Sequence, residues 1–540
     1  MQKRKYCKQI YILATCLLLG ITACKKDFLV RDNPTATTDS KWWNLETDLQ
    51  SALEQIYGGL PCGTLGNYDF IANSRIHLAA TTDEAVFRGN YGDWQVYPVG
   101  LATSQTGSVQ EIYQKSYSYI RNASRFLENY RKAYVEDTVR KARYAAEARA
   151  LRAWYHLDLF LLYGPIPIVN QSLPPTGQFV KRNSRDEVVN FLVAELDTAA
   201  ASLPATYTES DAYRMSKGTC YALQAILYIN VGNYAKCLEA SRKLIALNVY
   251  ELYHSSDPAI NSYSGLFSYS GIINKERILF RRGGQTESFF RSAPKSLGGQ
   301  ATTSPTAAIV NTYETLQGKT LSELGADSMA IYKRQPEYKQ NRDPRLAASV
   351  MIPGETFVNR KLDPFTPGGP DLIGQTQSTQ TGYWIKKYVD PRDAGTPWGG
   401  SLNFMIIRYA EILLDYVESL VETGDWQNPD VVKYLNMIRN RAGMPNVDIN
   451  QYNTQLKMRE LVRRERQVEL AFEGQRLFDI RRWKTAEIVL NQAAEGAVDP
   501  STGKAVVIEQ RKFNAARDYV WPIPLAEINA NPNMQQNPNW

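Results

Sequence analysis

The chain has 540 residues and a formal net charge of +7, with 44% apolar and 22% charged residues. Its length exceeds the roughly 250–300 residues at which a single hydrophobic core stops growing, so we expect more than one subdomain. The composition excludes a disordered chain, a collagen-like repeat and a polytopic membrane protein. With three His and six Cys, the sequence offers few ligands for a metal or haem centre, and we expect no metal site and no cofactor.

The N-terminus has the pattern of a secretion signal. Four cations within the first eight residues precede an uncharged, mostly apolar run, Ile10 to Ala23, which is shorter than the roughly 20 residues of a membrane-spanning helix. The run ends in Ile21-Thr22-Ala23-Cys24, which resembles the lipobox of bacterial lipoproteins. We therefore predict a signal peptide over residues 1–23 and a lipid anchor, with palmitate among its acyl chains, at Cys24. The alternative is an ordinary signal peptide with an incidental cysteine.

Removing residues 1–23 deletes four cations and no anions, which leaves a net charge of +3. That charge is too small for a nucleic-acid footprint in a chain of this length, so we expect no nucleic-acid partner. After Cys24 only Cys62, Cys220 and Cys237 remain, and they can form at most one disulfide. The fold must therefore rest on its hydrophobic core.

Helical periodicity dominates the chain after the signal. Residues 24–45, with a Thr-rich stretch, predict a lipidated tether, and residues 46–249 predict an N-terminal helical region. Within that region, Val139–Tyr163 carries apolar residues at three- and four-residue spacing. Gly164-Pro165 follows at once, which predicts a long helix that ends there.

Two helical pairs share one pattern. In the first, Ser216 is a candidate N-cap and Gly232-Asn233 forms the turn. In the second, Met405–Gly443, the turn is Gly424-Asp425-Trp426 and Pro429 opens the second helix. We expect the turn glycines to let the helices approach closely and the aromatic residue after each turn to fill the gap. The pairs resemble tetratricopeptide repeats, although they lie too far apart in the sequence for a continuous array.

The helical pattern fades between residues 250 and 404, where Gly, Pro, Ser and Thr are frequent. A stretch of that length without structure is uncommon in a compact protein, so we expect a loop-rich subdomain of short helices and strands. Loops on a rigid frame are a usual place for binding sites. Residues 405–540 then complete the scaffold. The predicted fold is mainly α, with tetratricopeptide-like helix pairs and an inserted loop-rich ligand-binding subdomain.

The densest mixture of aromatic, amide and charged side chains in the N-terminal half follows residue 87. The candidate ligand-binding residues in this segment are Arg88, Asn90, Tyr91, Asp93 and Trp94. Aromatic rings stack on the apolar faces of sugars while Asn, Asp and Arg bind hydroxyls, and the same set also suits peptides. The alternative is a surface loop whose Trp is a packing anchor. For the opposite wall, the loop-rich region offers Tyr263, Phe289 and Trp398.

No arrangement of residues predicts catalysis. Asp83 and Glu84 are adjacent, whereas the two carboxylates of a glycosidase stand about 5–10 Å apart across the scissile bond. N-capping or structural ion pairing is therefore the better interpretation of this pair. The sequence has no motif for a nucleophilic serine, a zinc protease, a P-loop or a dinucleotide fold. His156 lies in an apolar-rich helix and is interpreted as a core or interface residue. We predict a binding protein with no catalytic residue.

The run Arg463–Arg476 combines dense charge with apolar residues at helical spacing. Glu465, Glu469 and Glu473 nearly neutralise its arginines. Internal ion pairs with a solvated face are therefore favoured over a basic binding site.

Short motifs stand in order along nearly the whole chain after the signal. They include Thr82-Asp83-Glu84, Leu162-Tyr163-Gly164-Pro165-Ile166-Pro167, Asn341-Arg342-Asp343-Pro344-Arg345-Leu346, Ile407-Arg408-Tyr409-Ala410-Glu411, Phe472-Glu473-Gly474, Asp479-Ile480-Arg481-Arg482-Trp483 and Pro522-Ile523-Pro524-Leu525-Ala526-Glu527-Ile528. Each motif is weak alone, but the ordered set strongly resembles the SusD/RagB family of nutrient-binding outer-membrane lipoproteins of Bacteroidetes. One departure is the ending Asn539-Trp540, where the family usually has Gly-Tyr.

The resemblance implies a fold of tetratricopeptide helix pairs with an irregular ligand-binding subdomain. It also implies a lipid-anchored protein at the cell surface that captures a nutrient, commonly a glycan, and caps a SusC-like TonB-dependent transporter. The aromatic platform varies across the family, and some relatives serve peptide uptake. An oligosaccharide is therefore the leading ligand, and an oligopeptide receptor, a surface hydrolase and a plain repeat scaffold are the alternatives.

Overall fold

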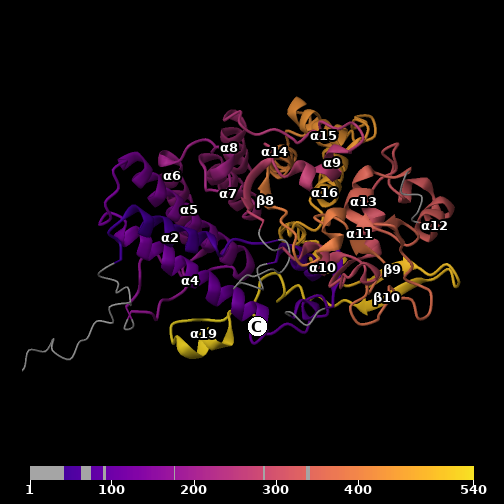
Figure 1. Ribbon diagram of the computed structural model, residues 1–540, viewed down its shortest axis with the longest axis horizontal. Helices are drawn as coiled ribbons and strands as arrows, with labels where there is room; N and C mark the ends of the chain where they lie inside the picture. Colours follow the sequence, from indigo (N-terminus) through magenta and orange to yellow (C-terminus); the bar gives the residue numbers. More distant parts are fainter. Residues whose placement is uncertain (1–41, 63–73, 89–92, 175–176, 284–285, 336–340) are drawn as a thin grey trace, which may run out of the picture.

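Long helices form one side of the molecule, as the computed structural model shows (Figure 1). The structure describes residues 42–62, 74–88, 93–174, 177–283, 286–335 and 341–540. The helices of the N-terminal half are α2 (Glu46–Tyr57), α3 (Arg75–Leu78), α4 (Gly107–Asn129), α5 (Thr138–Tyr163), α6 (Arg185–Ser202), α7 (Lys217–Asn230) and α8 (Tyr234–Ala246). From α4 to α8 each helix packs against the next along the chain. This is the arrangement of stacked helix pairs.

The ends of these helices follow the sequence signals. The Asp137 side chain accepts a hydrogen bond from the Arg140 backbone N–H at 3.0 Å and caps α5, which ends at Gly164 with a φ of 74°. At α7, the Ser216 hydroxyl accepts from the Thr219 N–H at 3.1 Å. The predicted helix over 139–163 and the predicted N-cap at Ser216 are confirmed.

The second helical pair is α14 (Tyr409–Glu422) and α15 (Pro429–Ala442). The Asn428 side chain accepts from the Asp430 N–H at 3.0 Å, Pro429 opens α15, and Gly443 ends it with a φ of 91°. α14 packs against both α7 and α8, so the two pairs are neighbours in space. The two pairs are therefore far apart in the sequence but adjacent in the fold.

The turn glycines have a different role from the one predicted. A Cβ atom at Gly232 or Gly424 would have no neighbour within 4 Å, so close helix approach does not require glycine at either position. Both residues have a positive φ, 75° and 91°, which favours glycine because it has no Cβ. The aromatic residues after the turns, Tyr234 and Trp426, do pack partly buried against the core.

Between α8 and α14 the described helices are short. They are α9 (Ser262–Leu266), α10 (Ser288–Ser292), α11 (Ala307–Thr312), α12 (Ala326–Arg334) and α13 (Pro344–Ser349). The strands of this stretch are β2 (Arg277–Arg281), β3 (Thr303–Pro305), β4 (Val350–Met351), β5 (Thr356–Phe357), β6 (Arg360–Lys361), β7 (Trp384–Ile385) and β8 (Phe404–Arg408). Loops connect these elements on the right of Figure 1.

Antiparallel strand pairs join the loop-rich stretch to the helices. β1 (Ala85–Phe87) pairs with β3, with Ala85 opposite Pro305. β2 pairs with β8, which leads directly into α14, and Arg277 lies opposite Arg408. The other pairs are β4 with β7, β5 with β6, and β9 (Ala493–Val498) with β10 (Ala505–Gln510).

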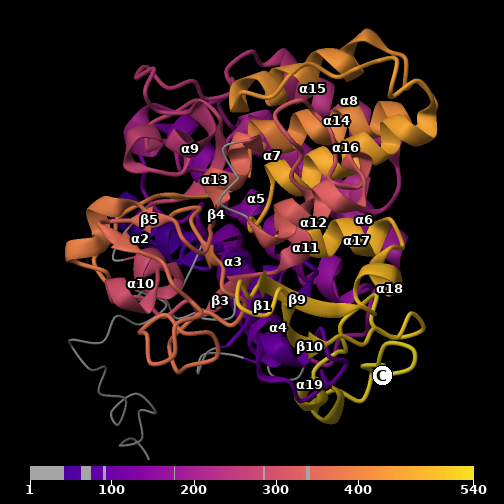
Figure 2. The same ribbon diagram turned by 90° about the vertical axis from the view of Figure 1, so that its right-hand side faces the viewer.

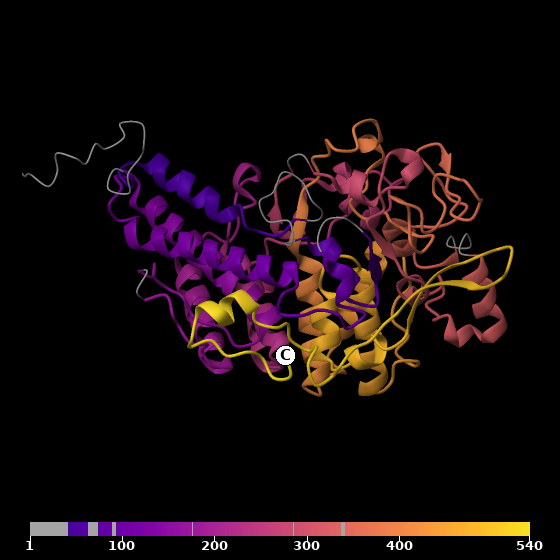
Figure 3. The same cartoon turned by 90° about the horizontal axis from the view of Figure 1, so that it is seen from below.

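The C-terminal part adds α16 (Gln455–Glu469), α17 (Arg476–Arg482), α18 (Ala486–Val489) and α19 (Leu525–Ala530). Figure 3 shows α19 lying across the N-terminal helices. Cys62, Cys220 and Cys237 are buried free thiols. Within the ranges the structure describes, every helix is too short or too polar to traverse a bilayer.

α16 lies at the centre of a buried network of charges, which we call the α16 network. Its members, connected by ion pairs, are Arg345, Lys387, Arg408, Arg439, Arg441, Arg464, Glu276, Glu314, Asp343, Glu465, Glu469 and Glu473. The six cations balance the six carboxylates. The Glu469 carboxylate contacts three arginines: Arg345 at 3.1 Å, Arg408 at 2.7 Å, and Arg441.

The predicted internal ion pairs of the Arg463–Arg476 run are thus confirmed. The predicted solvated face is wrong for its glutamates, because Glu465, Glu469 and Glu473 are all buried. Burial acts to raise the pKa of Glu469, but the surrounding Arg441, Arg408 and Arg345 guanidinium groups lower it well below its ordinary value. The charges therefore hold core segments together.

Candidate functional site

The structure places Trp94 in the core. Its side chain is 1% exposed, in a short 3₁₀ helix over Trp94–Val96. Its ring stacks on Tyr97, with ring centroids 5.9 Å apart, and lies 6.4 Å from the ring of Trp521. A buried ring cannot present a face to a sugar, so the prediction of Trp94 as a stacking platform is wrong. The alternative interpretation, a packing anchor, fits the structure.

Tyr263 and Phe289 are also buried, and their prediction as ligand contacts is wrong for the same reason. The Tyr263 hydroxyl donates to the Glu469 carbonyl at 2.7 Å, so this ring packs against the α16 network. Phe289 belongs to a small core that includes Phe357 and Trp384. Both side chains are therefore part of the packing that holds the loop-rich stretch in place.

Asp93 supports a helix end. Its carboxylate accepts hydrogen bonds from the backbone N–H groups of Gly107 at 2.6 Å and Ser108 at 3.2 Å, at the first residues of α4. A negative charge at a helix N-terminus is favourable, which explains an Asp at this position. The structure therefore assigns Asp93 to helix capping.

Arg88 is exposed, and its Nη1 atom donates to the Gly374 carbonyl at 2.7 Å and to Gln380 Oε1 at 3.0 Å. It is a surface residue of the loop-rich side and stays a candidate contact. Asn90, Tyr91 and the predicted lipidation site Cys24 lie outside the described residues.

Trp398 has the properties expected of a platform. Its side chain is 52% exposed, and it is the one exposed Trp among the residues that the structure describes. One face of the indole stacks on the buried ring of Phe290, at an interplanar angle of 29°. The Phe290 N–H donates to the Pro397 carbonyl at 3.2 Å, which fixes the two segments to each other. The ring is thus held from below while much of its surface faces solvent.

Hydrogen bonds hold the loop that carries Trp398. The Tyr269 hydroxyl donates to Asp393 Oδ1 at 2.8 Å and accepts from the Ser401 N–H at 2.8 Å. The Thr286 N–H donates to the Gly400 carbonyl at 2.7 Å. A Cβ at Gly400 would lie 2.9 Å from an Asp393 carboxylate oxygen and 3.1 Å from the Thr286 carbonyl oxygen, so glycine avoids crowding at this contact. The loop is preorganised, which lowers the entropy cost of binding.

One buried cation lies beside the indole, and a second, exposed cation lies over the Tyr269 ring of the same loop network. The Arg291 guanidinium lies 5.9 Å from the Trp398 ring centroid, and its Nη1 donates to Gln300 Oε1 at 3.0 Å. Arg392 lies 4.3 Å over the Tyr269 ring and forms an ion pair with Asp390 at 3.0 Å. We call this set, Trp398 with Tyr269, Arg291, Gln300 and Arg392, the Trp398 surface. Figure 2 shows α10, which carries Phe290 and Arg291, at the edge of the molecule.

Of the six ligand-binding candidates that the structure describes, only Trp398 lies on this surface. Sequence reasoning missed its partners Phe290, Tyr269 and Gln300. The one available signal was the order Pro397-Trp398-Gly399-Gly400, an aromatic residue within turn-forming residues, since turns are usually exposed. Nothing in the sequence indicated which aromatic ring would support the indole.

A second concave surface lies between α4, the segment after α5, and α19. It encloses about 240 Å³ and is lined by Tyr113, Tyr117, Arg121 and Glu527 among others. The Tyr113 hydroxyl is buried there without a hydrogen-bond partner. This α4–α19 pocket has the polar and aromatic lining of a small-ligand site, on a different side from the Trp398 surface.

Asp83 and Glu84 are buried structural groups. Both oxygens of Asp83 accept from Arg476, at 2.8 Å and 2.7 Å, which confirms the predicted ion pairing. Burial raises the pKa of Glu84 to about 8, and one of its oxygens accepts from the Phe472 N–H at 3.3 Å. His156 is fully buried, as predicted for a core residue.

Stacked helix pairs thus carry an exposed indole on hydrogen-bonded loops. Two family models match the chain: the SusD family over residues 273–540, and a family described as starch-binding and associating with outer membrane over residues 27–229. The chain belongs to the SusD/RagB family.

Relatives and solved structures agree with this assignment. SusD-like protein P2 of Formosa agariphila is 24% identical over 98% of this chain and 99% of its own length. A SusD-like carbohydrate-binding protein of Bacteroides fragilis has a TM-score of 0.81 and 27% identity, covering 91% of this chain and 99% of that one. A second SusD-like protein of Bacteroides fragilis has a TM-score of 0.79 and 25% identity, covering 93% and 99%. The mainly helical fold is that of this family.

Proposed function

We propose that this protein is a cell-surface lipoprotein that captures an oligosaccharide and delivers it to a SusC-like TonB-dependent transporter. The observation that carries the proposal is the exposed indole of Trp398, supported by Phe290 on a hydrogen-bonded loop. Family membership and the similarity to a SusD-like carbohydrate-binding protein support a glycan as the ligand class. An indole face fits the apolar face of a pyranose, and Arg392, which lies over the ring of Tyr269 in the same loop network, is suited to hydroxyl groups.

The anchor and the partner are part of the same proposal. Lipidation at Cys24 supplies membrane affinity, and the family whose model covers residues 27–229 is described as associating with outer membrane. Cys24→Ala should release the protein from the membrane fraction. Gentle solubilisation of the wild type should recover a large TonB-dependent barrel with it. If the Cys24→Ala variant stays in the membrane fraction, the lipid anchor is contradicted. If the wild type is always recovered alone, the transporter partner is contradicted.

The ligand assignment is tested by a glycan array followed by titration of Trp398→Ala with the glycan that binds best. By analogy with base stacking on aromatic residues, the loss should be about 1–3 kcal/mol, or about tenfold to hundredfold in affinity. Tyr134→Ala is the matched control, because Tyr134 is 74% exposed and is no part of the Trp398 surface. Phe290→Ala should also weaken binding, since it removes the support of the indole.

Three outcomes would change the proposal. Binding to a peptide library without any glycan binding would make the protein an oligopeptide receptor. Unchanged glycan affinity in Trp398→Ala, with a loss on Tyr117→Ala, would move the site to the α4–α19 pocket. Turnover of a bound polymer by the purified protein would make it a surface hydrolase.

A further inference from the structure

Arg481 forms no ion pair with a carboxylate among the described residues. Arg481 lies in α17 and is 8% exposed. Its Nη2 atom donates to the Asp518 carbonyl at 3.4 Å, while the buried Nε and Nη1 atoms have no hydrogen-bond partner. Leaving buried donors of a charged group unsatisfied costs several kcal/mol, so this group requires an explanation.

The neighbours of Arg481 in the motif Asp479-Ile480-Arg481-Arg482-Trp483 show the contrast. Arg482 forms ion pairs with Glu418, at 2.5 Å, and with Asp479, at 2.8 Å. The indole N–H of Trp483 donates to the same Glu418 at 2.6 Å. Every polar side chain of the motif except Arg481 is thus satisfied by a carboxylate or guanidinium of the protein.

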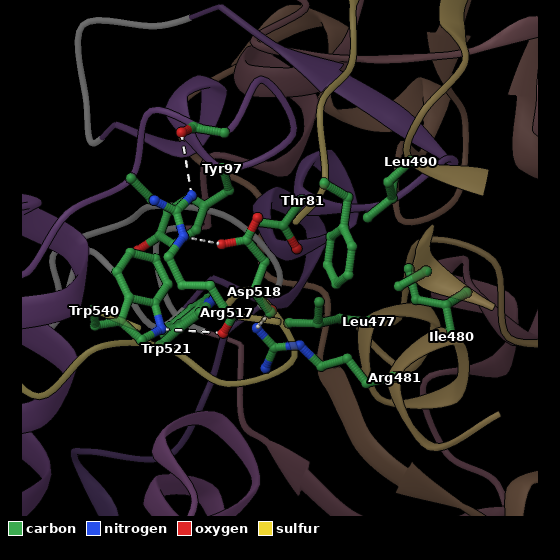
Figure 4. A pocket seen from close by; sticks show the side chains of 14 residues that line it. Thr81, Tyr97, Leu477, Ile480, Arg481, Leu490, Arg517, Asp518, Trp521 and Trp540 are labelled. Atoms are coloured by element: carbon green, nitrogen blue, oxygen red, sulfur yellow. Dashed lines mark hydrogen bonds and ion pairs between the residues drawn. The ribbon is translucent and has the colours of Figure 1, made fainter. Parts of the chain in front are cut away.

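Arg481 borders a small cavity of about 30 Å³ (Figure 4). A cavity of this volume can hold about two particles of the size of water. The charged residues that line the cavity are Arg481, Arg517 and Asp518. The Asp518 carboxylate accepts from Arg517 Nε at 2.6 Å and from the Asn514 N–H at 2.8 Å. Arg517 and Asp518 neutralise each other, so the lining carries one net positive charge, that of Arg481.

We propose that this cavity binds a small monovalent anion, of the size and charge of chloride, through the Nε and Nη1 atoms of Arg481. One negative charge neutralises the lining, and the small volume favours a compact anion over sulfate, phosphate and larger carboxylates. The ring of Trp521, 5.7 Å from the guanidinium carbon, closes one side of the site and favours the cation. Burial lowers the pKa of Arg481 to about 10, so the guanidinium stays charged at neutral pH and needs the anion there.

The direct test is diffraction from crystals of the wild-type protein soaked in sodium bromide, with data collected at the bromine edge. We expect an anomalous peak at hydrogen-bond distance from Arg481 Nε and Nη1. Electron density of a water molecule without an anomalous peak would overturn the proposal. This test needs no variant.

A second test compares melting temperatures at constant ionic strength in sodium chloride and in sodium gluconate, whose anion is too large for the cavity. Chloride should raise the wild-type Tm by about 1–2 °C in a saturable way, because an anion that binds only the folded state stabilises it. Arg481→Met should lose this response. In gluconate it should melt no lower than the wild type, because it removes an unpaired buried charge.

Arg360→Met is the matched control, since Arg360 is an exposed arginine of β6. It should keep the full chloride response. An equal chloride response in wild type and Arg481→Met would assign the effect to general screening and overturn the proposal. A poorly folded Arg481→Met would leave the bromide experiment as the deciding one.

Discussion

The α16 network and the Trp398 surface place side chains in opposite ways. In the network, eleven buried charged groups and the half-buried Arg464 are paired with one another, so charge serves the core. At the Trp398 surface, a large apolar ring is exposed, and polar groups beneath it fix its loop. Each region reverses the usual rule that charge lies outside and aromatic rings lie inside. A paired buried charge indicates architecture, whereas an exposed and supported ring indicates a ligand.

The sharpest way to break the network is to neutralise its central carboxylate. Glu469→Gln keeps the shape of the side chain but leaves Arg345, Arg408 and Arg441 with too little negative charge. We expect a loss of about 3–5 kcal/mol in the free energy of unfolding, measured by urea titration. Glu239→Gln, which removes an exposed partner of Lys236, should produce no measurable change. Equal effects of the two variants would show that the network does not stabilise the fold.

Trp94→Ala tests whether a buried tryptophan serves stability while the exposed Trp398 serves binding. Because Trp94 is buried, the substitution creates a cavity and should cost about 3–5 kcal/mol of stability. Glycan affinity, measured well below the melting temperature, should stay at the wild-type value. Trp398→Ala should give the reverse pattern. A Trp94→Ala variant with normal stability and weak binding would restore Trp94 as a ligand contact.

Buried histidines should make the protein lose stability in acid. Burial lowers the pKa of His77 and His156 from 6.5 to about 3. Between these pH values the unfolded chain binds a proton on each histidine and the folded chain does not, so stability falls as pH falls. Each histidine contributes about 1.4 kcal/mol per pH unit. His156 Nε2 accepts from the Val169 N–H at 3.1 Å, a bond that protonation would break.

The measurement compares urea unfolding of wild type and His156→Gln at pH 6 and pH 5. The variant should lose less stability over this interval, by about 1.4 kcal/mol. Wild type and variant must be compared because Glu84 acts in the opposite direction. Burial raises the pKa of Glu84 to about 8, so the folded chain binds a proton that the unfolded chain does not. This group therefore makes stability rise as the pH falls from about 8. Parallel pH dependence in both proteins would mean that His156 titrates normally in the folded state.

The smallest expected effect is at Asp93. Asp93→Ala removes the acceptor of two N–H groups at the start of α4 and should cost about 1 kcal/mol in stability. Asp93→Asn keeps an acceptor and should lose less. Neither variant should change glycan affinity. Weaker glycan binding by Asp93→Asn at normal stability would place Asp93 in the site after all.

The sequence predicted the helical framework well because its signals are local. The caps at Ser216 and Pro429, the stop at Gly164 and the periodic apolar stripes act within a few residues of each other. The candidate site depends on partners far apart in the chain. Trp398 is supported by Phe290, and Tyr263 is covered by Glu469, and no local pattern indicates either contact. An aromatic residue in a Gly-rich segment therefore predicts exposure only weakly.

The pairing of Asp83 with Arg476 joins positions 393 residues apart, and Arg511 donates to the Ala85 carbonyl across 426 residues. Folding is slow when essential contacts join distant parts of a chain. The segment around residue 83 must wait for partners synthesised hundreds of residues later, and until then its carboxylates are unpaired. We therefore expect a long-lived intermediate with exposed apolar helix faces, which makes protection from aggregation during folding a requirement of this topology.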